Sequence, residues 1–180
     1  MKVNTSLCAI LIVFLTIISG CTVNTSHTND AANTPPSPRH WSYPYVRVLL
    51  RWDLVNGGYS NDFNFENNMR EKTFVNILVN GIKRSSPETF EIERFRQLYY
   101  MSDNSTLTKE EAASLIAKIY GISPEDGSYY STLLKKGLIN REFSQRLKGK
   151  NTVTRGEAFC LAAHIITHHR EFHERFCLSK

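Results

Sequence analysis

Two short segments each place a cationic side chain directly after a threonine, at the start of a run with helical periodicity. They are Thr108-Lys109-Glu110-Glu111 and Thr154-Arg155-Gly156-Glu157. In each, the Thr hydroxyl can accept a hydrogen bond from the backbone N–H of the last Glu, and the carboxylate of that Glu can accept one from the backbone N–H of the Thr. This pair of bonds is a capping box at a helix start. A cation in the first turn opposes the helix dipole by a few tenths of a kcal/mol up to about 1. Because Lys109 and Arg155 oppose that local preference, we expect these two cations to have a functional role.

Cysteines and histidines near the C-terminus could coordinate a soft metal ion. They form two trios at intervals of four residues: Cys160, His164 and His168, and then His169, His173 and Cys177. Such spacing aligns side chains along one helix face. We expect the first two residues to face the core and the other four to lie on a frayed polar tail. Since zinc sites usually need four ligands in closed geometry, we expect no metal site and no cofactor.

No nucleophile, base and acid can be read in the order that catalysis would need. The prominent acidic residues are accounted for as loop, cap and surface groups: Asp62, Glu66, Glu71, Glu110, Glu111 and Glu157. Gly57-Gly58 is a turn rather than a phosphate loop, because no Lys-Ser/Thr follows it. No Lys/Arg cluster with interleaved aromatic residues indicates nucleic acid. We therefore expect a binding protein without enzymatic activity and without a nucleic-acid partner.

The N-terminus indicates export. After Lys2, an apolar run from Cys8 to Ile18 is too short to span a bilayer and fits the central region of a signal peptide. The run leads into Ile18-Ser19-Gly20-Cys21, which resembles the lipobox of bacterial lipoproteins. That resemblance implies cleavage before Cys21, lipidation of its thiol, for example with palmitate, and a membrane anchor on the extracellular face. The alternative is an ordinary secretory signal with an incidental cysteine, although its usual small-residue site is missing.

The rest of the chain is expected to form a tether, one domain and a tail. Residues 21–40 are rich in Thr, Asn, Ser and Pro and predict a disordered tether, 41–170 predict one domain, and 171–180 predict a polar tail. Removing 1–20 removes one Lys and no acid, so the formal charge of +5 becomes +4. This mild surplus permits an acidic partner without requiring one. In an exported protein Cys160 and Cys177 could pair, or Cys160 could be a buried free thiol.

Three helix–loop–helix units follow one another, at about 41–83, 87–121 and 127–168. In the first unit, Asn68 is the expected N-cap of the second helix. In the second, one helix is expected over 87–101. In the third, a polar loop is expected over 140–151.

Two helices of these units show their inward faces clearly in the sequence. The helix over 87–101 is expected to turn Phe90, Ile92, Phe95, Leu98 and Tyr99 inward. The last helix is expected to turn Phe159, Cys160, Ala163 and Ile166 inward, with Thr167 as a further candidate at its end. Because a helical pair cannot bury its apolar face alone, the units must pack on each other in an all-α domain.

With these residues in view, the chain resembles the S-layer homology (SLH) domain family from about Trp41 to His168. Family repeats carry a Trp- and Tyr-bearing first helix, then Gly-Ile-Ile-Asn-Gly, a loop, and Ile-Thr-Arg-Ala-Glu-Phe. The matching segments here are His40 to Val46, Leu54-Val55-Asn56-Gly57, Gly137-Leu138-Ile139-Asn140, and Val153-Thr154-Arg155-Gly156-Glu157. The resemblance implies a pseudo-threefold bundle of three repeats.

The resemblance also implies a ligand, namely secondary cell-wall polysaccharide, often pyruvylated, that is bound non-covalently between the repeats. The principal contact of the family, an Arg, falls on Arg70, Lys109 and Arg155, where a cation and nearby free N–H groups would form an anion site. Asn56 and Gly57 match the last two residues of the family's Gly-Ile-Ile-Asn-Gly segment and are expected to contact the ligand. Trp41 could stack on a sugar or could cover the end of the core.

We therefore expect a cell-envelope lipoprotein of a Gram-positive bacterium whose SLH-like module binds wall glycan and anchors or organises the envelope. The alternative is an envelope lipoprotein that uses a degenerate SLH fold to bind a protein partner.

Overall fold

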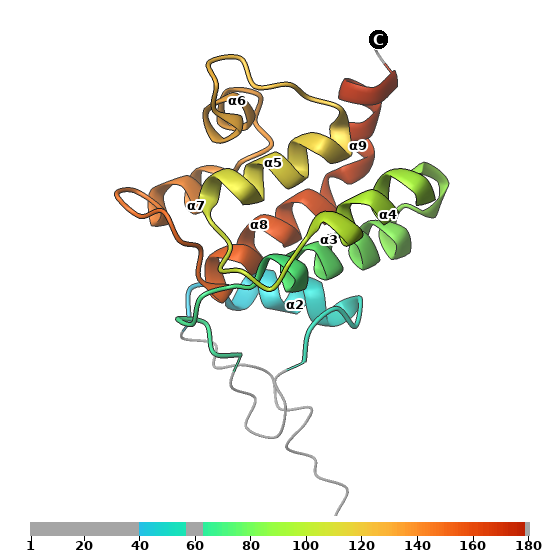
Figure 1. Ribbon diagram of the computed structural model, residues 1–180. Helices are drawn as coiled ribbons and strands as arrows, with labels where there is room; N and C mark the ends of the chain where they lie inside the picture. The colour runs from blue at the N-terminus through green and yellow to red at the C-terminus, as the bar shows by residue number, and fades with distance from the viewer. Residues whose placement is uncertain (1–39, 57–62, 179–180) are drawn as a thin grey trace, which may run out of the picture. The chain divides into compact units, whose positions relative to one another are not determined.

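The computed structural model describes residues 40–56 and 63–178, and these residues fold into helices (Figure 1). The signal peptide, nearly all of the tether, Cys21 and Gly57 lie outside the described residues. The helices are α2 (Tyr43–Arg51), α3 (Glu71–Ser85), η4 (Pro87–Thr89), α4 (Ile92–Met101), α5 (Lys109–Tyr120), α6 (Tyr129–Lys135), α7 (Arg141–Arg146), α8 (Arg155–Thr167), α9 (His169–His173) and η5 (Glu174–Leu178). Isolated β-bridges join some of the loops, but the described residues contain no strand, so the predicted all-α class is confirmed for them.

Both predicted capping boxes form. At the start of α5, the Glu111 N–H donates to the Thr108 hydroxyl over 3.2 Å, and the Thr108 N–H donates to the Glu111 carboxylate over 2.7 Å. At the start of α8, the corresponding distances between Thr154 and Glu157 are 3.4 and 2.8 Å. These bonds satisfy N–H groups that a helix start otherwise leaves without partners. They fix Lys109 and Arg155 as the first residues of their helices.

Three extended segments, each directly before α3, α5 or α8, hydrogen-bond to one another in a closed ring. The Met69 N–H donates to the Val153 carbonyl over 2.8 Å, Val153 donates to Leu107 over 2.9 Å, and Leu107 donates to Met69 over 2.8 Å. All three side chains are fully buried. β-bridges continue the pairing on either side, between residues 68 and 154, 70 and 106, and 108 and 152. The ring therefore gathers the starts of these three helices at one place.

The ring explains why the expected N-cap Asn68 is wrong. Asn68 and Arg70 both take part in the bridges, so the backbone there is extended, and α3 begins only at Glu71. The N-cap is Arg70, whose side chain makes no capping bond. Arg70 therefore precedes the first helical residue, whereas Lys109 and Arg155 each occupy it.

The polar loop expected over 140–151 contains a short helix, α7. The Asn140 side chain caps it by accepting the Phe143 N–H over 2.9 Å. Phe143 and Leu147 lie four residues apart and are both buried, so one turn of helix places two apolar side chains in the core. The prediction failed because the other residues of this segment are polar, which gives no periodic signal.

The helix expected over 87–101 is interrupted. The chain forms η4, leaves the helical conformation at Phe90 and Glu91, and then forms α4. This break rotates the face of α4, so Phe95 and Leu98 are buried as expected but Ile92 and Tyr99 are 63% and 40% exposed.

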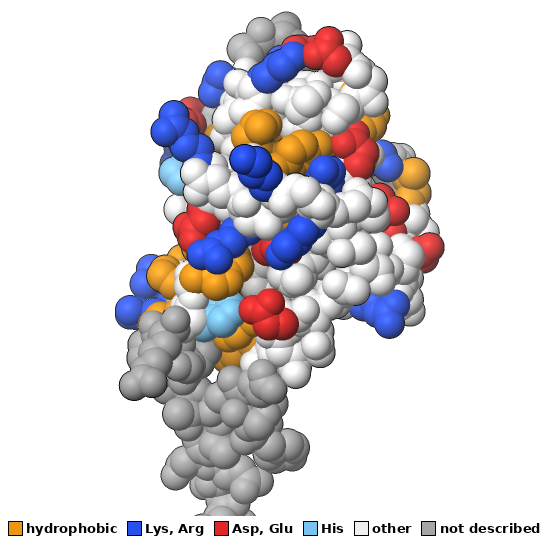
Figure 2. Space-filling view, turned by 90° about the vertical axis from the view of Figure 1, so that its left-hand side faces the viewer, with side chains coloured by type: hydrophobic (Ala, Val, Ile, Leu, Met, Phe, Trp, Pro, Cys, Tyr) orange, Lys and Arg blue, Asp and Glu red, His pale blue; other side chains and the backbone are white. Residues whose placement is uncertain are grey.

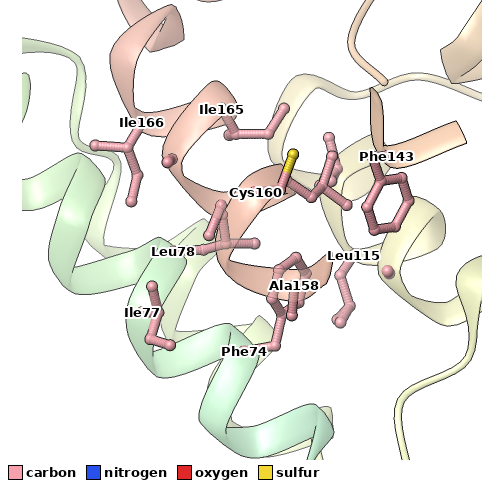
Figure 3. Packing of buried hydrophobic residues seen from close by; sticks show 14 of the residues in the cluster. Phe74, Ile77, Leu78, Leu115, Phe143, Ala158, Cys160, Ile165 and Ile166 are labelled. Atoms are coloured by element: carbon pink, nitrogen blue, oxygen red, sulfur yellow. The ribbon is translucent and has the colours of Figure 1, made fainter. Parts of the chain in front are cut away.

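Helix α8 lies in the middle of the core (Figure 1). All of its residues from Gly156 to Ala163 are buried, as are Ile165 and Ile166. Figure 3 shows side chains of α8, among them Cys160 and Ile166, packed between residues of α3 and of the segments on its other side, such as Phe143. A helix that is apolar all round is expected to be surrounded by neighbours. Cys160 is a free thiol, and burial raises its pKa to about 11.

The segment after α8 is not the frayed polar tail that we expected. It continues as α9 and the π-helical turn η5. His169 and Phe172 are buried, and the rings of Phe172 and Phe176 lie 5.9 and 6.3 Å from that of Tyr120 on α5. Aromatic contacts of this kind stabilise the packing of α9 on α5. Cys177 is a free thiol in the same segment.

Helix α6 is capped from another helix, by the carboxylate of Glu110 on α5. This carboxylate accepts the backbone N–H groups of Tyr129 and Tyr130 and, over 3.0 Å, the hydroxyl of Ser128. We expect Glu110→Gln to lower the free energy of unfolding by about 1–2 kcal/mol, because the charge at the helix start and one acceptor are lost. Urea denaturation measures this. Glu93→Gln, which removes an exposed first-turn charge of α4 and its ion pair with Arg96 but no bond to a backbone N–H, should cost about 0.5 kcal/mol, and equal effects would contradict the prediction.

Candidate functional site

Arg155 is held at the start of α8 by the loop that precedes α3. Its Nε donates to the Phe63 carbonyl over 2.9 Å, and its guanidinium lies 5.4 Å from the centre of the Phe159 ring. These contacts fix the side chain in a half-buried position. Its charge therefore stands at a defined place beside the helix start, as a binding residue requires.

The first N–H groups of α8 are already bonded, so they do not form the anion site that the family resemblance implied. The Arg155 N–H donates to the Asn67 carbonyl over 2.8 Å, and the Gly156 N–H donates to the Phe65 carbonyl over 2.9 Å. The Glu157 N–H is taken by the capping box. An anion beside Arg155 must therefore be bound by side chains rather than by the start of α8.

A pocket of about 570 Å³ lies between the end of α2, one face of α3 and the start of α8. It brings together Arg155 and Asn56, two of the residues expected in the site, and Phe159. The other lining residues are Asp53, Leu54, Val55, Thr73, Asn76, Ile77, Asn80 and Arg84. Arg84 donates to the Trp52 carbonyl and lies 3.8 Å from Asp53, so its guanidinium is oriented. Guanidinium, carboxylate, amide and hydroxyl groups around an apolar wall suit a polar ligand that carries hydroxyl groups.

Arg155 also lines a second pocket, of about 460 Å³, together with Arg70. The remaining lining residues are Asn64, Asn67, Asn68 and Thr106. The Arg70 guanidinium donates to the Asn104 carbonyl over 2.9 Å. The structure therefore places Arg70 and Arg155 in one pocket, although they are far apart in the sequence. Two guanidinium groups among amides can bind an anion by charge-assisted hydrogen bonds.

Lys109 and Trp41 line neither of these pockets. Lys109 lies in a separate pocket of about 300 Å³, where its ammonium is 5.6 Å from the centre of the Tyr130 ring. The Trp41 ring packs against the core and is covered by the Arg146 guanidinium at 4.3 Å. Figure 2 shows the side of the domain that carries α6 and α7, where Lys and Arg side chains gather with hydrophobic ones between them. The expected glycan-site residues that the structure describes therefore divide between the two arginine pockets and the side that carries α6 and α7.

Sequence reasoning missed the polar face of α3. Thr73, Asn76, Asn80 and Arg84 follow one another at intervals of three or four residues and line the pocket that holds Asn56. The spacing was visible in the sequence, because such intervals align side chains on one helix face. The spacing alone does not indicate a binding site, because only the packing of α2 and α8 against α3 shows that this face borders a pocket.

The described groups with perturbed pKa values lie mostly away from the arginine pockets. Burial, and then the hydrogen bond to Glu142, raise the pKa of Tyr45. Burial also raises the pKa of Glu71, while hydrogen bonds from Ser105 lower the pKa of Asp103. The Cys160 thiol, whose pKa is also raised, is a weak nucleophile at neutral pH, because only the thiolate reacts readily.

Comparisons with protein families, with curated proteins and with solved structures found no match to this chain. Within the described residues, no helix has the length and apolar character needed to cross a membrane.

Proposed function

We propose that this protein is a lipid-anchored envelope lipoprotein whose SLH-like module binds cell-wall glycan non-covalently and carries out no catalysis. Cys21 would carry the lipid after removal of residues 1–20. The module would bind secondary wall polysaccharide, pyruvylated or otherwise anionic, and so anchor or organise the envelope of a Gram-positive bacterium. Arg155 and Arg70 would contact the anionic groups, and Asn56 would contact hydroxyl groups.

The closed hydrogen-bond ring supports an arrangement of three repeats around a pseudo-threefold axis. Met69, Leu107 and Val153 make equivalent bonds in cyclic order. A second set of equivalent bonds runs around the ring in the opposite direction, from the N–H of Glu71 to Ser105, of Lys109 to Asn151, and of Arg155 to Asn67. Helices α3, α5 and α8 then have equivalent positions, which are those of the second helix in three repeated units.

The observation that carries the ligand assignment is the place of Arg155. Its guanidinium is oriented by the Phe63 carbonyl and lines both the pocket with Asn56 and the pocket with Arg70. An extended polymer could occupy both pockets at once, because they share this side chain. Lys109 would contribute less, since it lies in a smaller separate pocket and an ammonium cannot bind a carboxylate bidentately.

We expect Arg155→Ala to weaken binding to purified Gram-positive wall sacculi at least ten-fold, which is about 1.4 kcal/mol, because a charge-assisted contact is lost. A further loss is expected when Arg70→Ala is combined with it. Co-sedimentation of the full chain, kept in solution in detergent, with sacculi measures the affinity. Raising the salt concentration should weaken wild-type binding more than binding of the double variant.

Arg155→Lys and Arg51→Ala serve as controls. Arg155→Lys keeps the charge without the planar fork and should have an intermediate affinity. Arg51 is exposed on α2 and lines none of the described pockets, so its loss should have little effect. Sacculi stripped of their anionic polymers by acid should bind poorly. If the double variant binds as the wild type does, the glycan site is wrong, and if the wild type does not bind sacculi, a protein-binding role replaces this proposal.

A further inference from the structure

Helix α4 has an outer surface that is unusually apolar. Ile92, Tyr99, Tyr100 and Met101 are 63%, 40%, 78% and 65% exposed. In the described part of the chain, only Leu134 and Leu178 are also large exposed hydrophobic residues. A surface helix normally turns polar side chains to solvent, and a cluster of exposed apolar ones usually marks an interaction surface.

Beside these residues, α3 and α4 form a groove of about 440 Å³. From α3 it is lined by Asn76, Val79, Asn80 and Lys83, which share the i, i+3, i+4, i+7 spacing of one helix face. From α4 and the residues before it, it is lined by Phe90, Ile92, Phe95, Arg96, Tyr99 and Tyr100. A groove with an apolar lining between two neighbouring helices has the shape that accepts a third helix.

The charges that line the groove are positive. They are Lys83 and Arg96, and no acidic side chain is among the described lining residues. Arg96 pairs with Glu93 at 3.3 Å, but both are exposed, so this pair holds the guanidinium only weakly. The Lys72 ammonium lies 5.1 Å from the centre of the Tyr99 ring and adds a third cation beside the groove. The complementary ligand is therefore apolar along its contact face and acidic at its edges.

We propose that the α3–α4 groove binds an amphipathic helix of a partner protein, with apolar side chains in the groove and acidic ones beside Lys83, Arg96 and Lys72. A second copy of this chain fits less well, because pairing two such faces would bring like charges together. A lipid surface also fits less well, because a concave lining favours a protruding helix over a flat membrane. The proposal does not depend on glycan binding, although Asn76 and Asn80 line both this groove and the pocket with Arg155.

The test uses a fluorescent 18-residue helical peptide with leucines on one face and glutamates beside them, together with a matched peptide that carries lysines instead. The full chain is held in nanodiscs of uncharged lipid, and empty nanodiscs give the background. We expect fluorescence anisotropy to report binding of the acidic peptide with a dissociation constant on the order of 10 μM and at least ten-fold weaker binding of the basic one. Ile92→Ser combined with Tyr100→Ser should weaken binding of the acidic peptide at least ten-fold.

Leu134→Ser is the matched control, because it removes an exposed apolar side chain from α6 and should leave the affinity unchanged. The α4 variant should keep its affinity for sacculi, and Arg155→Ala should keep its affinity for the peptide, so this proposal and the glycan proposal can fail separately. Equal binding of the two peptides, no binding of the acidic one, or an affinity unaffected by the α4 variant would overturn the proposal. Two further results would overturn the proposal. One is that anionic lipid, but not the peptide, protects α4 from hydrogen exchange. The other is that the α4 variant loses only self-association.

Discussion

Replacing Gly81 by valine is expected to lower the free energy of unfolding by about 3 kcal/mol, since overpacking a filled core costs about 1–3 kcal/mol and at times more. Gly81 lies on α3 and faces the side chain of Ile166 on α8. A Cβ atom added there would lie 2.2 Å from Cδ1 and 2.7 Å from Cγ1 of Ile166, and 3.0 Å from Cδ1 of Leu54. Because Ile166 is only 2% exposed, its side chain has little room to move.

Alanine at position 81 separates two opposing effects. It improves helix propensity by about 1 kcal/mol, but it introduces the same close contact with Ile166. We expect the close contact to outweigh the gain in helix propensity, so the free energy of unfolding should fall by about 1–2 kcal/mol. Urea denaturation measures this. Combining Gly81→Ala with Ile166→Val removes the nearest atom, so the double variant should lose less than the sum of the single variants. Lys83→Ala, an exposed change on the same helix, should be nearly neutral, and a neutral Gly81→Val would refute the close crossing.

Features set by neighbouring residues in the chain were predictable from the sequence. Both capping boxes depend on residues three apart, and both form as expected. The burial of Phe159, Cys160, Ala163 and Ile166 follows from helical spacing, and the structure confirms it. Thr167, the further candidate at the end of this helix, is exposed.

Features set by contacts distant in sequence were predicted less well. The start of α3 shifted because the residues around Met69 bond to those around Leu107 and Val153, and no local pattern reveals such a ring. The close approach at Gly81 likewise depends on which residue of α8 lies opposite. Local preference was overridden by tertiary contacts in both cases.

The candidate site shows the same division. Short sequence segments are enough to predict Arg155 and Asn56 as site residues, and both line one pocket. Arg84 contributes to that pocket but lies in a stretch without a motif, so only the packing of α2 against the rest of the domain indicates it. Trp41 was selected as an aromatic residue, yet its ring face is covered by Arg146 from α7, the helix that the sequence did not predict.

Acidification from pH 7 to pH 4 is expected to destabilise the protein through His169. This residue is 1% exposed, its Nδ1 lies 2.9 Å from the Tyr120 hydroxyl, and its Nε2 is buried without a hydrogen-bond partner among the described residues. Burial, and then the neighbouring His173, lower the pKa of His169 to about 4, while Glu88 opposes this only in part. Burial also lowers the pKa of His164 on α8.

The sign follows from proton uptake. An unfolded histidine has a pKa of about 6.5, so between pH 6.5 and about 4 the unfolded chain binds more protons at position 169 than the folded one does. The contribution of His169 to the free energy of unfolding should therefore be constant above about pH 7 and fall as the pH decreases through this window. For His169 alone the loss is on the order of 3 kcal/mol, and His164 acts in the same direction.

Urea denaturation of the wild type and of His169→Gln at pH 7, 6, 5 and 4 measures this contribution. Glutamine keeps a polar partner for Tyr120 but does not titrate, so the variant should lose less stability on acidification than the wild type does. Carboxylates with lowered pKa values, such as Asp103 and Asp126, act in both proteins and cancel in the difference. His168→Gln should stay closer to the wild type than His169→Gln does, because His168 is exposed and acts only through the lowered pKa of His164. If the free energy of unfolding falls equally with decreasing pH in the wild type and in His169→Gln, the buried imidazole does not cause the acid sensitivity of the protein.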